Sequence, residues 1–243
     1  MIRYGLIGRQ LAHSFSRSYF SSKFEQEGRT DHRYDLFELD HIGALPQLLS
    51  STPGLRGLNV TIPYKQEVIP FLDQLSPTAS AVGAVNTIDL RGGMRIGHNT
   101  DVEGFRATLM PLIGDDRPRA LVLGSGGASR AVVFVLRGSG IKFRVVSRSR
   151  DTGDLTWDML DPTLVAVCPL IINTTPLGMF PQVDAMPALP MQAVGSKHLL
   201  VDLVYNPHQT RFLSEGAARG ARCVNGLGML HAQAEAAWRI WNT

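Results

Sequence analysis

The sequence predicts an α/β protein of two domains: an N-terminal α/β domain and a Rossmann-type dinucleotide-binding domain, with a cleft between them. Strand-like segments alternate with helical ones along the 243 residues, which is typical of mainly parallel sheets. In the second half, an apolar strand runs directly into a glycine-rich turn and then a helix. That order is found where doubly wound sheets bind nucleotides.

The first domain is expected to cover residues 1–100 and to be completed by the C-terminal helix, 226–243. The alternation predicts strands at 3–8, 34–39, 55–62 and 85–91, and helices at 16–27, 41–49 and 64–72. Asp101 precedes a helical pattern at 102–113, so we expect it to be the N-cap of a helix that connects the two domains.

The second domain is expected to cover residues 101–225. Its predicted strands are 119–124, 143–147, 170–175 and 199–205. The first of these is apolar without alternation, as expected for a strand that is buried on both faces. Apolar residues recur at helical spacing over 229–241, which predicts a long final helix.

Composition excludes several classes of protein. Hydrophobic residues make up 44% and charged residues 19%, as in ordinary globular proteins. No apolar run reaches the ~18 residues of a membrane span, and the start lacks a secretory pattern, so we expect a cytoplasmic protein without a membrane partner. Two cysteines, Cys168 and Cys223, are too few for a disulfide framework or a zinc site, and both are expected to be buried. The net charge of +3 comes from scattered basic residues, so no nucleic-acid partner is expected.

The glycine-rich turn GSGGAS, residues 124–129, predicts a site for a pyrophosphate. Gly124 permits a tight turn, Gly126 lets the backbone approach the phosphates, and the free N–H groups of the following helix attract them. Ser129 stands where the usual pattern has its third glycine. The predicted cofactor-binding residues of this turn are Gly124, Ser125, Gly126, Gly127 and Ala128.

The next strand indicates which cofactor is used. A NAD-binding protein usually places an acid after this strand, whereas arginine suits the 2′-phosphate of NADP because it donates paired hydrogen bonds. Here Ser147 is followed by Arg148 and Arg150. Asp151 is the alternative, because a small shift in alignment would bring it to the ribose. We predict NADP(H), with Ser147 and Arg148 among its binding residues.

Seven short motifs occur in one order along nearly the whole chain: HSFS (13–16), NVTIPYK (59–65), GAVNTI (83–88), GHNTD (97–101), NTTPLGM (173–179), DLVYNPHQT (202–210) and NGLGMLHAQA (225–234). Together they resemble the shikimate dehydrogenase family. The resemblance implies reversible NADPH-dependent reduction of 3-dehydroshikimate to shikimate, a step in the biosynthesis of chorismate and aromatic amino acids.

The resemblance also implies a catalytic pair, Lys65 and Asp101. Hydride that arrives at a carbonyl carbon leaves an alkoxide, and Lys65 would donate the proton it needs. Asp101 would hold both the lysine and a substrate hydroxyl in place. Lysine is scarce here, at four of 24 basic residues, which adds slight support. The implied substrate-binding residues are Ser14 and Ser16 for the carboxylate, and Thr61, Asn86, Asp101 and Gln233 for the hydroxyl groups.

Further cofactor-binding residues follow from the resemblance, most of them around the nicotinamide: Thr174, Leu203, Tyr205 and Gly226. Thr175, beside Thr174, would also lie near the nicotinamide or its ribose. Met179 is a weaker candidate, and Met229 is expected to belong to the core.

The first motif departs from the family pattern. Arg17 replaces a proline, and Phe20-Ser21 replace His-Asn. We hypothesise that Arg17 adds a cation near the substrate carboxylate.

Two alternatives stay open at the level of sequence. One is a quinate/shikimate dehydrogenase with relaxed cofactor use, against which the arginines after residue 147 argue. The other is a non-catalytic ligand-binding relative, against which the retained Lys65 and Asp101 argue. The sequence does not distinguish a monomer from a homodimer.

Overall fold

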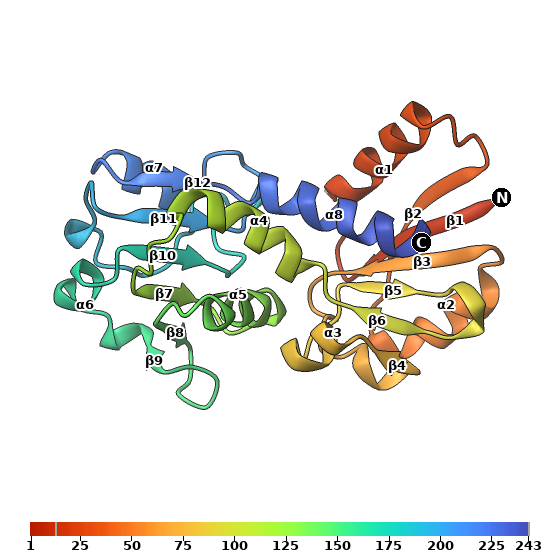
Figure 1. The fold of residues 1–243 in the computed structure, drawn as a ribbon, viewed down its shortest axis with the longest axis horizontal. Coiled ribbons are helices and arrows are strands. Elements are labelled where there is room, and N and C mark those ends of the chain that lie inside the picture. Colours follow the sequence, from red (N-terminus) through yellow and green to blue (C-terminus); the bar gives the residue numbers. More distant parts are fainter. Residues whose placement is uncertain (13, 243) are drawn as a thin grey trace. The chain divides into compact units, whose positions relative to one another are not determined.

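The computed structural model of the chain describes residues 1–12 and 14–242, which form two compact units (Figure 1). The first unit comprises Met1–Thr100 and the end of the chain from Ala234, and the second comprises Asp101–Gln233. The second boundary falls inside the last helix, α8 (Leu227–Asn242). Each unit contains its own six-stranded sheet.

The first unit is a mixed sheet with helices. Its strands run in the order β2-β1-β3-β5-β6-β4. β1 is parallel to β2 and β3, and β4 is parallel to β6, whereas β5 is antiparallel to its neighbours β3 and β6. The sheet is therefore mainly parallel, as expected, with β5 as the reversed strand. The elements are β1 (Ile2–Gly8), α1 (Phe15–Gln26), β2 (His32–Glu38), α2 (Leu45–Ser51), β3 (Leu55–Val60), β4 (Gln74–Leu75), α3 (Pro77–Val82), β5 (Thr87–Asp89) and β6 (Ile96–His98).

One predicted helix is wrong. Residues 64–72 form consecutive turns with a single 3₁₀ helix, Ile69–Phe71. Pro70 lies in the middle of this segment, lacks a backbone N–H and disfavours helical geometry in the residue before it. An α-helix therefore cannot run through the segment.

The second unit is a doubly wound sheet in which all paired strands are parallel. Its order, β12-β11-β10-β7-β8-β9, is the Rossmann order, and the switch point lies between β7 and β10. The strands are β7 (Ala120–Leu123), β8 (Phe143–Ser147), β9 (Leu155–Thr156), β10 (Leu170–Asn173), β11 (Leu199–Asp202) and β12 (Arg222–Val224). The helices that begin in this unit are α4 (Asp101–Ile113), α5 (Gly127–Gly138), α6 (Pro162–Ala166), α7 (Arg211–Ala217) and α8. The remaining 3₁₀ helices of the chain are Ile42–Ala44, Arg91–Gly93, Trp157–Met159 and Met191–Ala193.

The last turns of α8 pack into the core of the first unit. Trp241 is buried, stacks on Tyr4 with ring centroids 4.9 Å apart, and donates from Nε1 to the carbonyl oxygen of Ile88 over 3.0 Å. A Cβ atom on Gly57 would lie 2.2 Å from Trp241 Nε1, so the indole occupies the space that a side chain on β3 would fill.

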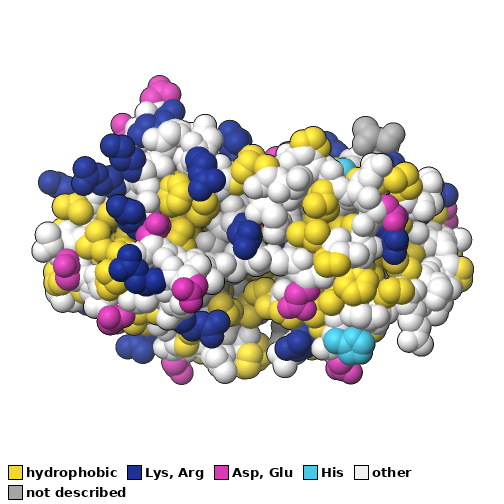
Figure 2. Space-filling model, turned by 90° about the horizontal axis from the view of Figure 1, so that it is seen from below, with side chains coloured by type: hydrophobic (Ala, Val, Ile, Leu, Met, Phe, Trp, Pro, Cys, Tyr) yellow, Lys and Arg dark blue, Asp and Glu magenta, His cyan; other side chains and the backbone are white. Residues whose placement is uncertain are grey.

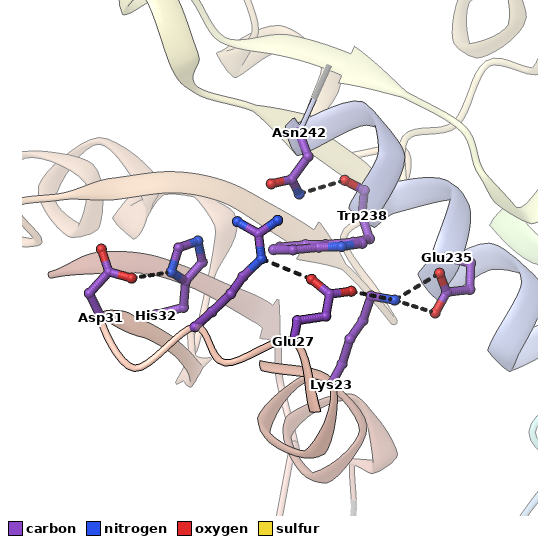
Figure 3. Close-up of polar contacts among 8 residues, drawn as sticks. Lys23, Glu27, Asp31, His32, Glu235, Trp238 and Asn242 are labelled. Atoms are coloured by element: carbon purple, nitrogen blue, oxygen red, sulfur yellow. Dashed lines mark hydrogen bonds and ion pairs between the residues drawn. The ribbon is translucent and has the colours of Figure 1, made fainter. Parts of the chain in front are cut away.

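Charged groups at the surface join α1 to the same helix (Figure 3). Lys23 Nζ donates to both carboxylate oxygens of Glu235, over 2.9 and 3.0 Å, and also contacts Glu27 at 3.1 Å. The Tyr19 hydroxyl donates to Glu235 as well. These bonds connect the helix that follows Ser14 to the helix that carries Gln233.

No helix within residues 1–12 and 14–242 is both long and apolar enough to cross a membrane.

Candidate active site

Lys65 lies in the turn that follows β3, and the backbone around it is firmly held. Tyr64 is fully buried, and its hydroxyl donates to the carbonyl oxygen of Leu39 over 2.5 Å. The N–H of Val85 donates to the carbonyl oxygen of Lys65 over 2.7 Å. The lysine is therefore fixed through its neighbour on one side and through the segment before Asn86 on the other.

Asn86 connects that segment to the residue before Asp101. Its Oδ1 accepts a hydrogen bond from the Thr100 N–H over 2.7 Å, and its Nδ2 donates to Thr100 Oγ1 over 2.9 Å. Asn86 and Thr100 are 2% and 3% exposed, so this junction is effectively dry. Lys65 is hydrogen-bonded to Val85, the residue before Asn86, and Asp101 follows Thr100, which is bonded to Asn86.

A ladder of buried polar groups continues from this junction. Asn59 Nδ2 donates to Thr87 Oγ1 over 3.2 Å, and Tyr34 donates from its hydroxyl to Asn59 Oδ1 over 2.7 Å. Burial raises the pKa of Tyr34 above its ordinary value, so the phenol stays a donor. Asn59, Tyr34 and Thr100 are not among the site residues that the sequence predicts. The available signal was the presence of polar residues inside otherwise apolar strands.

Ser14 and Ser16 stand at the start of α1. Ser14 is the N-cap of this helix, and its side chain accepts a hydrogen bond from the Ser16 N–H over 3.2 Å. Both serines are half-buried. His13, the first residue of the motif, lies outside the described residues.

The residues that depart from the family motif lie in α1. Phe20 is fully buried and stacks on Tyr34 with ring centroids 4.5 Å apart, so it fills the aromatic core. Arg17 is exposed and lines an open groove between α1 and β2 together with Arg29 and Arg33. Its contact with a substrate carboxylate stays a prediction.

Asp101 and Gln233 lie on two helices that pack closely together. Asp101 is the first residue of α4 rather than its N-cap, and it is 4% exposed. The partial positive charge of a helix N-terminus stabilises a carboxylate there. One turn later, a Cβ atom on Gly104 would lie 2.7 Å from the Met229 carbonyl oxygen and 3.0 Å from Gln233 Cβ. Glycine at 104 thus lets α8 approach α4 beside Asp101.

The glycine-rich turn has the geometry of a phosphate cradle. Gly124 has φ +110°, and a Cβ atom on it would lie 2.7 Å from Thr174 Oγ1. Thr174 Oγ1 donates to the Leu123 carbonyl oxygen over 2.8 Å, which joins the ends of β7 and β10 at the switch point. Gly126 begins α5 without a side-chain cap, and no atom lies within 4 Å of a Cβ built there. No side chain therefore caps the first turn of α5 or crowds Gly126, as suits a pyrophosphate site.

The turn after β8 favours arginine over aspartate as the phosphate-binding residue. Ser147 is buried, and its Oγ accepts a hydrogen bond from the Ser149 N–H over 3.2 Å. Ser149 Oγ in turn donates to the Asp151 carboxylate over 2.8 Å. Asp151 thus serves the turn itself, while Arg148 and Arg150 are exposed.

Basic side chains gather on this part of the second unit. Figure 2 views the side on which β8 and β9 lie in Figure 1, and it shows Lys and Arg side chains over that part with acidic ones among them. The exposed basic residues around β8 are Arg137, Lys142, Arg144, Arg148 and Arg150. Their field attracts an anionic ligand.

The loop that follows β11 meets the residue before the last helix. The Gly226 N–H donates to the Val204 carbonyl oxygen over 3.1 Å, and a Cβ atom on Gly226 would lie 2.1 Å from the Leu203 carbonyl oxygen. Only glycine fits that approach. Tyr205 is half-buried, and Met229 is 7% exposed, as expected for a core residue.

The two cysteines differ in burial, and no metal site is found among the described residues. Cys168 is buried but Cys223 is partly exposed, so the expectation that both are buried is wrong for Cys223. Across the described part of the chain, no three His, Cys, Asp or Glu side chains are grouped so that they could hold a metal ion.

These features define a two-unit α/β protein with a Rossmann-type dinucleotide site. A family model for the shikimate dehydrogenase substrate binding domain matches residues 6–88. The shikimate dehydrogenase (NADP(+)) of Syntrophomonas wolfei is 40% identical over 93% of this chain and 84% of that protein. The chain belongs to the shikimate dehydrogenase family.

Solved structures show the same likeness. Shikimate 5-dehydrogenase from Thermus thermophilus, in complex with NADP(H) and shikimate, has a TM-score of 0.87 and 34% identity, covering 99% of this chain and 93% of that one. Quinate dehydrogenase from Corynebacterium glutamicum, in complex with NAD, has a TM-score of 0.85 and 29% identity over the same shares.

Proposed function

We propose that the chain is an NADP-dependent shikimate dehydrogenase, which reversibly reduces 3-dehydroshikimate to shikimate. The observation that carries this proposal is the buried junction at Asn86. It connects the turn of Lys65, through Val85, to the start of α4, where Thr100 precedes Asp101. The residues on either side of this junction lead to the two side chains that the family motif assigns to chemistry.

The residues of the second unit fit NADP. The open N-terminus of α5 and the positive φ at Gly124 suit the pyrophosphate, and exposed Arg148 suits the 2′-phosphate. Thr174, Leu203, Tyr205 and Gly226 lie in or beside the loops at the carboxyl ends of β10 and β11, where doubly wound sheets bind ligands. When bound, the reduced cofactor supplies the hydride.

Lys65 transfers the proton, and Asp101 positions the reacting groups. The Lys65 ammonium donates its proton to the oxygen of the reduced carbonyl, and in the oxidative direction the neutral amine takes it back. Asp101 holds the lysine and a substrate hydroxyl in the geometry that the transfer requires.

The substrate is recognised by hydroxyl and amide groups. Ser14 and Ser16, at the start of α1, bind the carboxylate. Thr61, Asn86 and Gln233 bind the ring hydroxyls, because a hydroxyl both donates and accepts and an amide offers both partners.

An activity assay tests the proposal directly. Turnover would be followed by the absorbance of the reduced nicotinamide, with shikimate and quinate each offered with NADP⁺ and NAD⁺. We expect shikimate with NADP⁺ to give the highest kcat/KM. A preference for quinate or for NAD⁺ would support the alternative activity of the Corynebacterium relative, and no turnover with any pair would support a non-catalytic ligand-binding protein.

The location and assembly of the enzyme are part of the proposal. It is expected to act in the cytoplasm, as a monomer or as a homodimer. Light scattering during size-exclusion chromatography distinguishes the two.

A further inference from the structure

We propose that Asp202 is a positioning residue for the nicotinamide part of the cofactor site. Its carboxylate joins the loops that follow β10 and β11 into one fixed surface. This inference rests on the proposed function, because the same loops carry Thr174, Leu203 and Tyr205.

Asp202 is the last residue of β11 and pairs in register with Asn173, the last residue of β10. Its Oδ1 accepts hydrogen bonds from Asn173 Nδ2 over 2.9 Å and from the Val204 N–H over 3.0 Å. Its Oδ2 accepts from Thr210 Oγ1 over 2.6 Å. One side chain thus receives donors from the neighbouring strand and from both ends of its own loop.

The bonds continue from these partners into the loops. Asn173 Oδ1 accepts from the Thr175 N–H over 3.0 Å and from Thr175 Oγ1 over 2.7 Å, which fixes the segment after β10. Thr210 is the N-cap of α7, so the loop after β11 is held where it enters that helix. The Leu203 N–H donates to the Asn173 carbonyl oxygen over 2.9 Å. Displacing Asp202 would release both loops together.

Asp202 is fully buried, and three uncharged groups donate to it. Burying a carboxylate costs free energy, and well-packed apolar residues often stabilise a core as well as buried charge does. Desolvation accordingly raises the pKa of Asp202 to about 6 although all three hydrogen bonds act to lower it. Stability alone does not explain this residue, whereas ordering two cofactor loops does.

Comparing the binding of two ligands distinguishes a positioning role of Asp202 from a general loss of structure. Adenosine 2′,5′-bisphosphate carries the adenosine and the 2′-phosphate of NADP⁺ but has no nicotinamide, so it reports on the glycine-rich turn and Arg148 alone. We would measure its Kd and that of NADP⁺ by titration calorimetry at about pH 8, where Asp202 is ionised.

Asp202→Ala is expected to weaken NADP⁺ binding about 10-fold or more and to leave the bisphosphate within about 2-fold. Asp202→Asn should restore most of the NADP⁺ affinity. Its amide oxygen can accept from Asn173 and Val204, while its NH₂ group faces the Thr210 hydroxyl, which can rotate to accept. Asp161→Ala removes another helix-capping carboxylate from the same unit and should change neither Kd.

Equal losses of both ligands in Asp202→Ala would overturn the inference, as would unchanged binding of both. If that variant does not fold, Asn173→Ser carries the same expectation, because serine is too short to reach Asp202 from its strand. A wild-type protein that binds neither ligand would instead overturn the proposed function.

Discussion

Lys65 stands on a turn that is held by its backbone and by Tyr64, not by the lysine side chain alone. Lys65→Ala should therefore leave the turn in place and remove only the proton donor. We expect kcat to fall by about 10² to 10⁴-fold, the usual range for a general acid, with the Kd of NADPH nearly unchanged. Steady-state kinetics and a fluorescence titration with NADPH measure the two quantities.

Lys197→Ala is the matched control for this variant, because Lys197 is exposed and lies outside every proposed site. Its kcat should equal that of the wild type. A near-normal kcat in Lys65→Ala would remove this residue from the acid/base role.

Arg148 is the residue proposed to decide the choice of cofactor. Hydrogen bonds to charged groups contribute about 1.5–3 kcal/mol, so Arg148→Ala should raise the KM of NADPH about 10-fold or more. The KM of NADH should stay within about 2-fold, since NADH has no 2′-phosphate. Arg144→Ala, on the strand that precedes Arg148, serves as the control. Equal changes for both cofactors would contradict the assignment.

The packing of α8 against β3 depends on glycine at position 57, which has no side chain. A Cβ atom at Gly57 would lie 2.2 Å from Trp241 Nε1, so Gly57→Ala must displace the indole and its bond to Ile88. Overpacking of this kind costs about 1–3 kcal/mol, and urea denaturation followed by circular dichroism would show it. Gly138→Ala has open space around it and should change the unfolding free energy by less than about 1 kcal/mol. Equal effects of the two variants would contradict this account.

Elements with long apolar patterns were predictable and short ones were not. The strands predicted at 3–8, 119–124 and 143–147 match β1, β7 and β8 to within two residues at either end. β4, β6 and β9 have only two or three residues, too few for any period to register. The segment 64–72 has helical spacing, but Pro70 prevents a helix, and a pattern of apolar residues alone does not weigh that effect.

At the scale of the whole molecule, Asp202 should leave a mark on the pH dependence of stability. Its pKa of about 6 in the folded chain exceeds the ordinary 3.8, so the folded state holds this proton more tightly. The stability that results is complete below pH 3.8 and is lost as the pH rises through about 6. The difference in unfolding free energy between the wild type and Asp202→Asn should therefore fall by about 2 kcal/mol from about pH 4 to about pH 7. Urea denaturation across that range measures it, and a difference independent of pH would contradict the burial argument.

The residues of the candidate site stand out in the sequence, but the side chains that hold them in place do not. Lys65, Asp101 and the glycine-rich turn stand in recognisable motifs, and local sequence is enough to find them. The contacts between Asn86 and Thr100, or between Asp202 and Thr210, depend on how strands pair and where loops return. Such long-range geometry leaves no local pattern, so these partners became visible only in the folded chain.

The turn after β8 is closed by the serine hydroxyls at 147 and 149 and by Asp151, and neither Arg148 nor Arg150 has a part in those bonds. The groups that shape the turn are therefore separate from Arg148, the residue proposed to meet the 2′-phosphate. If Arg148 has the proposed role, cofactor preference is a modular trait: exchanging one exposed side chain should alter it and leave the turn that presents it intact. For protein engineering, position 148 is the place to retune this enzyme toward a different nucleotide without redesigning its fold.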